Sequence, residues 1–201
     1  MIEVIWDVET QKFFDDTGTA DPADLGVSIV SLYRRELDPQ LQEISGRMHS
    51  FFESDFDRMW KLFFEADRII GFNSKNFDVP AIKPYAPSQF AKLPHFDILE
   101  VLYSVVGRRM SLNALARDTL NTGKVDSGAN ALIYWQKGDP QSLRLLQTYC
   151  EADVAITRDL YDFAVKNKFL KYTDHWNNPR TIEVDFSYPA AIRPDKQLGL
   201  F

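Results

Sequence analysis

The sequence predicts an α/β fold in which a mixed β-sheet is flanked by helices. Segments with strand character come first along the chain, and segments with helical periodicity follow them. Residues 2–8 are apolar until Asp7 except for Glu3, which is typical of a central strand buried on both faces. Residues 140–166 carry the longest helical pattern. A sheet built from the first half and covered by the second half is therefore expected.

The first half is expected to supply most of the strands. A polar loop, residues 11–24, separates the first strand from a second at 25–33, and a third with a less regular pattern spans 41–51. Ser54 then begins a helix, and apolar residues follow it at helical spacing: Phe56, Met59, Trp60, Phe63 and Phe64. We assign this aromatic stripe to the core rather than to a platform for stacking bases.

The second half is expected to be mainly helical. Residues 69–72 predict a short strand, a helix follows from 78 to about 86, and another short strand lies near Phe96. A loop at 123–128 divides the helices that follow, which are expected at residues 97–106, 112–120, 129–137 and 140–166.

Two acids stand at the end of the first strand. Asp7 and Glu9 are two residues apart, so both side chains project from the same face of a strand. The carboxyl end of a strand is where open α/β sheets place their ligands. The alternative is an ordinary polar turn after a strand.

A third acid, Asp78, follows the strand predicted at 69–72. Gly71 allows close approach of the chain there, and Pro80 suits the first turn of the next helix. Asp78 is then a candidate ligand, although an acid near a helix start also caps the helix for local reasons.

A fourth acid, Asp153, lies within the apolar stripe of the helix predicted at 140–166. Its neighbours on that face are Leu146, Tyr149, Ile156 and Leu160. An inward-facing carboxylate needs a cation, either a metal ion or a buried Arg or Lys. Four carboxylates and the phenol of Tyr149 could hold two hard divalent cations and position a water for attack on a phosphodiester.

The three motifs resemble those of the ribonuclease H-like 3′–5′ exonucleases of the DEDD superfamily. Residues 7–10 resemble the first motif, residues 73–78 the second, and residues 149–153 the third. Thr148 stands where one branch has His, and Tyr149 stands where the other has Tyr. The chain therefore resembles the tyrosine branch, which includes the proofreading domains of family B DNA polymerases. The resemblance covers residues 1–170 and leaves 171–201 as an appendage.

The resemblance implies roles for particular residues. The acids Asp7, Glu9, Asp78 and Asp153 would hold two ions of Mg²⁺ or Mn²⁺, which oxygen ligands favour over zinc. Tyr149 would orient the attacking water, because its ordinary pKa of about 10 makes it a poor base. The terminal nucleotide would contact Thr10, Asn73 and Phe77. Many relatives have Thr-Gly-Leu after the first Glu, whereas this chain has Thr10, Gln11 and Lys12.

The net charge of −6 does not favour non-specific binding to duplex nucleic acid, which needs many Lys and Arg contacts. A short grip on a single-stranded 3′ end is expected instead, with DNA favoured over RNA. The candidates for this grip are Lys12, Lys75, Arg108, Arg109 and Lys124, although each could be an ordinary surface charge. Alternatives to a DNA exonuclease are an RNA-trimming exoribonuclease and a non-catalytic nucleic-acid-binding module.

The last five residues resemble the peptide by which bacterial polymerases and repair proteins bind the sliding clamp. Four of the five positions match that peptide: Gln197, Leu198, Leu200 and Phe201. Gly199 departs from the pattern, and its flexibility weakens the preference for a bound shape. The alternative is that these residues fold back onto their own domain. Clamp tethering would place the enzyme in DNA replication or repair.

The composition is that of one domain with an appendage. With 45% hydrophobic residues, 15 Phe and 8 Tyr in 201 residues, the chain can bury a full core. It has no apolar run suited to a bilayer, and its first residues do not resemble a secretory signal. The single cysteine, Cys150, cannot form an internal disulfide and suits a reducing cytoplasm. We interpret Cys150 as a packing residue.

Overall fold

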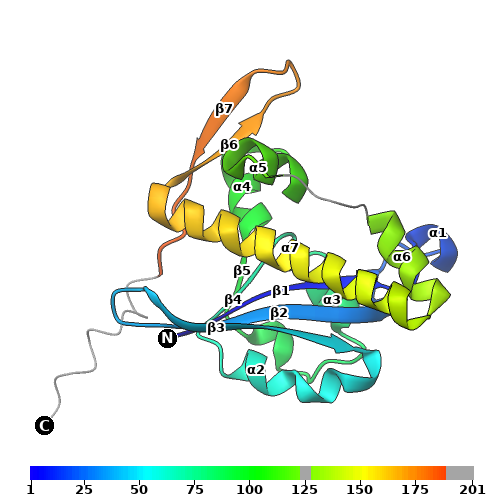
Figure 1. Ribbon diagram of the computed structural model, residues 1–201. Helices are drawn as coiled ribbons and strands as arrows, with labels where there is room; N and C mark the ends of the chain where they lie inside the picture. The colour runs from blue at the N-terminus through cyan, green and yellow to red at the C-terminus, as the bar shows by residue number, and fades with distance from the viewer. Residues whose placement is uncertain (123–127, 189–201) are drawn as a thin grey trace, which may run out of the picture.

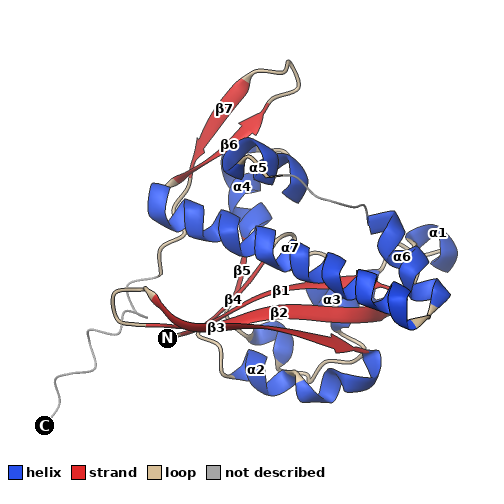
Figure 2. Cartoon of the chain, in the orientation of Figure 1, coloured by secondary structure: helices blue, strands red, loops and turns tan. Residues whose placement is uncertain are grey.

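A computed structural model of the protein describes residues 1–122 and 128–188. Its centre is a mixed five-stranded sheet in the order β3-β2-β1-β4-β5, flanked by helices on both faces (Figures 1 and 2). β1 is antiparallel to β2, and β2 to β3, whereas β1, β4 and β5 are parallel. The strands are β1 (Ile2–Thr10), β2 (Val27–Leu37), β3 (Glu43–Phe52), β4 (Arg68–Gly71) and β5 (His95–Asp97). The predicted α/β fold with a mixed sheet flanked by helices is confirmed.

β1 is the central strand and is buried on both faces, as its sequence predicts. Alternate residues point to opposite faces, so Val4 and Trp6 enter one core and Ile5 enters another. The register with β2 shifts between Glu9 and Thr10, where the strand reaches its carboxyl end.

One face of the sheet packs against short helices. They are a 3₁₀ helix (Glu53–Arg58), α2 (Trp60–Phe64) and α3 (Asp78–Ile82). Trp6 makes edge contacts with Phe63 and Phe90, at ring-centroid distances of 5.2 and 5.5 Å. The assignment of the aromatic stripe to the core is confirmed for every member except Phe64, which is 44% exposed.

Two of these helices differ from the expectation. The segment after Ser54 begins as a 3₁₀ helix and becomes α-helical only at Trp60. The helix predicted over residues 78–86 ends at Ile82, since Pro84 follows and cannot donate a backbone hydrogen bond. The polar loop after β1 contains two short turns of helix, α1 (Phe14–Thr17) and a 3₁₀ helix (Pro22–Asp24).

The long helix α7 (Pro140–Asn167) lies across the other face of the sheet (Figure 1). The side chain of Asp139 caps its first turn by accepting hydrogen bonds from Gln141 and Ser142, and Pro140 occupies the first helical position. The remaining helices on this side are α4 (Ile98–Val106), α5 (Leu112–Leu120) and α6 (Gly128–Lys137). None of the helices in the described residues is long and apolar enough to span a membrane.

A two-stranded hairpin follows α7 and was not expected from the sequence. It consists of β6 (Phe169–Thr173) and β7 (Pro179–Glu183). At its turn, Asp174 accepts hydrogen bonds from the backbone of Trp176 and Asn178. Leu170 and Ile182 join the core under α7. The division into residues 1–170 and 171–201 stays a prediction.

A buried polar network lies at the amino end of β1. The Glu3 carboxylate, 1% exposed, contacts Arg35 at 2.7 Å and accepts hydrogen bonds from the hydroxyls of Tyr161 and Tyr188. Burial and the charge of Glu3 raise the pKa of both tyrosines, so they remain hydroxyl donors. This network therefore connects the sheet, α7 and the chain beyond β7.

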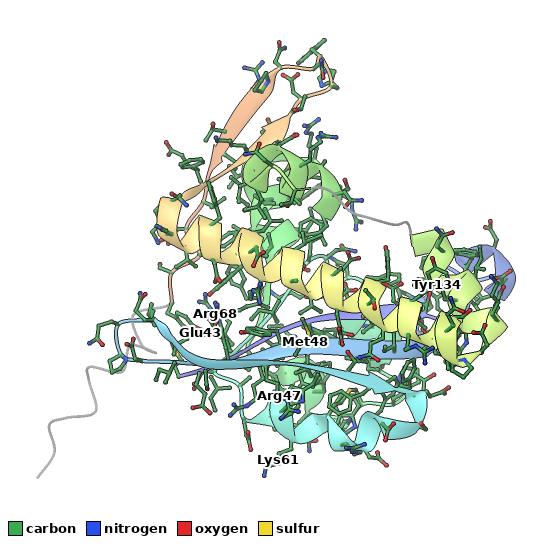
Figure 3. The ribbon with its side chains drawn as sticks, viewed as in Figure 1. Glu43, Arg47, Met48, Lys61, Arg68 and Tyr134 are labelled. Carbon is green, nitrogen blue, oxygen red and sulfur yellow. The ribbon has the colours of Figure 1, made fainter. Side chains whose placement is uncertain are left out.

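Arg68 extends this network. It donates hydrogen bonds to the Tyr161 hydroxyl at 2.8 Å and to the carbonyl oxygens of Phe186 and Ser187, and it stacks on the ring of Tyr188 at 3.6 Å. Arg68 and Glu43 lie at the end of the sheet remote from Tyr134 of α6 (Figure 3).

We expect Arg68→Ala to lower the free energy of unfolding by roughly 2–4 kcal/mol, because it leaves buried carbonyl and hydroxyl groups without their donor. Urea denaturation measures this change. Arg58→Ala, at a side chain that is 74% exposed, is the control and should change stability by less than about 0.5 kcal/mol. Equal, small effects of both variants would contradict a structural role for Arg68.

Candidate functional site

The end of β1 brings two predicted ligands together. Asp7 and Glu9 project from the face of the sheet that α7 covers. Three potential ligand atoms lie within 4.8 Å of one another: a carboxylate oxygen of Asp7, a carboxylate oxygen of Glu9 and the Sγ of Cys150. The first motif therefore forms a compact acidic group next to α7.

Cys150 joins α7 to this group. Its buried thiol contacts the backbone oxygen of Asp7 at 3.6 Å and the Oδ2 of Asp7 at 3.9 Å. Burial, with the nearby charges of Asp7 and Glu9, raises the pKa of Cys150 well above its ordinary value. A protonated thiol is a weak donor and a poor metal ligand. Cys150 is fully buried in a core cluster with Ile29 and Leu146, in agreement with its interpretation as a packing residue, and the carboxylates supply the donors that Mg²⁺ and Mn²⁺ prefer.

Asp78, the first residue of α3, contacts the backbone of β1. It is 3% exposed, and its Oδ1 accepts a hydrogen bond of 3.1 Å from the backbone N–H of Val8. The N-cap position of α3 belongs to Phe77, so the contact with β1 goes beyond local capping. Burial raises the pKa of Asp78 to about 7, the charge of Asp97 adds to this, and the Val8 N–H opposes it. A neighbouring cation would favour the charged carboxylate.

The middle of α7 carries the third motif. Tyr149 is 8% exposed and Asp153 is 5% exposed, and their spacing puts both on one face of the helix. The predicted burial of Asp153 is confirmed. Cys150 lies on the same stretch and contacts Asp7, so this part of α7 is held against the end of β1.

The second motif lies on a tight loop between β4 and α3. A Cβ added to Gly71 would lie 2.4 Å from the Cβ of Ser74, so the predicted close approach at this glycine is confirmed. Asn73 has a left-handed backbone with φ of 64°, and its carbonyl accepts hydrogen bonds from Asn76 and Phe77. This compact turn presents Asp78 at the start of α3.

Asp97 organises that loop from the end of β5. Its Oδ1 accepts a hydrogen bond from the backbone N–H of Asn73 at 2.8 Å, and its Oδ2 accepts one from the backbone N–H of Lys75 at 3.0 Å. The same carboxylate caps α4 by accepting from Leu99. An Asp before a helix predicts a cap, but the local sequence does not predict the hydrogen bonds between Asp97 and a loop more than twenty residues earlier.

The residues expected at the terminal nucleotide occupy the same region. Thr10 is half-buried at the end of β1, and its hydroxyl donates to the Lys12 carbonyl. Phe77 contacts Phe14 of α1 edge to face at 6.3 Å between ring centroids. Asn73 accepts a hydrogen bond from Arg109. The clamp-binding residues lie outside the described residues and stay a prediction: Gln197, Leu198, Leu200 and Phe201.

A sizeable cavity lies away from these acids. Its volume is about 820 Å³, and it is lined by Glu3, Arg35, Tyr161 and Tyr188 of the buried polar network, among others. Its position at the amino end of β1 separates it from Asp7 and Glu9.

A family model described as the RNase_H superfamily matches residues 4–165. No curated protein matches the sequence. Among solved structures, the fold is similar to a family B DNA polymerase from the hyperthermophilic archaeon Pyrobaculum calidifontis, with 18% identity and a TM-score of 0.54. It is also similar to a zinc-bound E. coli ExoI–ssDNA complex, with 16% identity and a TM-score of 0.48.

At 18% identity, the likeness to the polymerase concerns the fold alone. The alignment covers 82% of this chain and 24% of the polymerase chain, and 84% of this chain and 41% of the ExoI chain. This protein therefore spans less than half the length of either. The family model, in contrast, covers most of the chain and agrees with the resemblance of the motifs, so the chain belongs to the RNase_H superfamily.

Proposed function

We propose that the protein is a metal-dependent 3′–5′ exonuclease that releases nucleoside 5′-monophosphates from single-stranded ends. The observation that carries the proposal is the acidic group of Asp7 and Glu9 at the end of β1, against which Cys150 holds the middle of α7. This packing puts the helix that carries Tyr149 and Asp153 beside the first motif. The RNase_H superfamily membership and the fold shared with a family B DNA polymerase support the proposal.

The four acids would hold two ions of Mg²⁺ or Mn²⁺. When bound, such ions lower the pKa of a water and stabilise charge on the leaving oxygen. The protein contributes a fixed arrangement of donors: Asp7 and Glu9 from a central strand, Asp78 tied to Val8, and Asp153 from a long helix. Donors on buried regular elements lose little freedom when a ligand binds.

The reaction would be a hydrolysis. Water oxygen would form a bond to the terminal phosphorus, the bond from phosphorus to the 3′ oxygen of the preceding nucleotide would break, and that oxygen would take up a proton. Tyr149 would hydrogen-bond the water and orient it, because a phenol with an ordinary pKa of about 10 is a weak base near neutrality. Asn73, Phe77 and Thr10 would contact the departing nucleotide.

DNA is the favoured substrate, in replication or repair, and RNA trimming is the alternative. The net charge of −6 favours a short contact with a single-stranded end over non-specific duplex binding. The two substrates are distinguished with matched DNA and RNA oligonucleotides that are labelled at the 5′ end and incubated with Mg²⁺, Mn²⁺ or a chelator. Products that shorten stepwise from the 3′ end with metal, and none with chelator, are expected.

Asp7→Ala and Asp153→Ala should each abolish this hydrolysis while the fold remains intact, because each removes a proposed metal ligand. Turnover of the labelled oligonucleotide and the circular dichroism spectrum are the measurements. Asp159→Ala is the control, since Asp159 is an exposed acid of α7 that pairs with Arg158. Near wild-type turnover by either site variant would show that the site is misassigned.

Tyr149→Phe should lower turnover by tens- to thousands-fold and leave the dependence on metal concentration unchanged, because the hydroxyl orients water and does not bind a cation. Steady-state kinetics at several Mn²⁺ concentrations measure both quantities. Tyr103→Phe, at an exposed tyrosine of α4, is the matched control. An unaltered rate would leave Tyr149 as a packing residue only.

The C-terminal residues extend the proposal to a partner. A bacterial sliding clamp would be bound by Gln197, Leu198, Leu200 and Phe201, and tethering would raise the effective concentration of an acidic enzyme at DNA. Deleting residues 197–201 should remove binding to the host clamp and leave hydrolysis of free oligonucleotides unchanged. If the intact chain shows no clamp binding at tens of micromolar in a calorimetric titration, this part of the proposal is wrong.

A further inference from the structure

The basic residues that are candidates for binding the substrate differ in the contacts that they make. Lys75 is paired with Glu100 at 2.6 Å. Arg108 is half-buried, stacks on Tyr172 at 4.8 Å and donates a hydrogen bond to the Thr173 carbonyl at 3.2 Å. Both side chains therefore have structural contacts. Lys124 lies outside the described residues.

Arg109 differs from its neighbour. It is exposed, and its Nη2 donates a hydrogen bond of 2.6 Å to the side-chain oxygen of Asn73. Among residues 1–122 and 128–188, no carboxylate forms an ion pair with Arg109. A guanidinium has five N–H donors, so one bond to an amide leaves most of its capacity and its full charge for a ligand.

Lys12 is the remaining candidate, and it is less well placed. It is exposed on the loop after β1, where its backbone carbonyl accepts a hydrogen bond from Thr10. No contact holds its ammonium group against the second motif in the described part of the chain. A flexible lysine loses more side-chain entropy than a positioned arginine when it binds a phosphate.

The partner of Arg109 is itself rigid. Asn73 has a left-handed backbone, its N–H is bound to Asp97, and its carbonyl accepts the N–H of Phe77 at 3.0 Å. The guanidinium of Arg109 is thus held at a fixed turn, five residues before the proposed ligand Asp78. A positive charge so placed compensates for the acidic surface that a nucleic acid must approach.

We propose that Arg109 binds a backbone phosphate of the single-stranded substrate near its 3′ end and that Asn73 holds the guanidinium in position for it. This inference rests on the proposed exonuclease function, because the phosphate would belong to the strand whose end lies at the acids. Arg109 is a binding residue in this scheme, and it has no part in bond breaking. Planar guanidinium groups can contact a phosphate through two parallel hydrogen bonds.

The test is the salt dependence of binding. A fluorescent single-stranded DNA oligonucleotide is titrated with the full-length protein in chelator, so that hydrolysis does not interfere, at several NaCl concentrations. For single strands, each phosphate contact contributes about 0.7 to the slope of log affinity against log salt. Arg109→Gln should weaken binding several-fold at low salt and reduce the magnitude of the slope by about 0.7.

Two variants make this result specific. Arg108→Gln removes the same charge from the adjacent residue and should leave the slope unchanged, although it should lower the melting temperature through loss of the contacts with Tyr172 and Thr173. Arg109→Lys keeps the charge and should keep most of the slope while binding more weakly than wild type. The melting temperature of Arg109→Gln should match wild type, because Arg109 is exposed.

The outcomes distinguish the two proposals. If the wild-type protein neither binds nor hydrolyses oligonucleotides, the proposed function is wrong. If it binds but Arg109→Gln keeps the wild-type slope, the inference about Arg109 is overturned and the proposed function stands. An equal loss of slope in Arg108→Gln also overturns it, since the effect would then be one of net charge and not of a local contact.

Discussion

The buried pair of Glu3 and Arg35 is the interaction on which the arrangement of the molecule depends. Removing two charges from water costs several kcal/mol each, and this cost is offset only if every partner is in place. The partners come from distant parts of the chain: Arg35 from β2, Asp162 and Tyr161 from α7, and the hydroxyl of Tyr188. The pair therefore requires the sheet, the long helix and the segment after β7 to meet in one geometry.

The same two elements also carry the residues of the candidate site, away from this buried pair. β1 has Glu3 near its start and the proposed ligands Asp7 and Glu9 near its end, and α7 has Asp162 near its end and Tyr149 in its middle. A helix bound by buried hydrogen bonds at one end resists rotation about its axis. Rotation of α7 would move Cys150 away from Asp7, so the polar network at the amino end of β1 stabilises the packing of α7 on the first motif without touching it.

The parts of the structure that could be predicted are those that depend on local patterns. The apolar pattern of residues 2–8 predicted the central strand, and the apolar stripe around Asp153 predicted the burial of that carboxylate. Glu3 looked like an interruption, because its partners lie up to 185 residues away and no local pattern encodes them. The β6–β7 hairpin was missed because its strands have five residues each and its turn lacks the Asn-Gly or Asp-Gly signal of short hairpins.

The sequence separation of the contacts at the end of β1 has a consequence for synthesis on the ribosome. Cys150 and Asp7 are 143 positions apart, so the first motif leaves the ribosome long before α7 exists. At a translation rate of roughly 5–20 residues per second, the wait lasts on the order of ten seconds. During that interval β1 and β2 can pair, but the acids have no helix above them. The first motif of a nascent chain therefore stays without its partner helix until most of the chain has been synthesised.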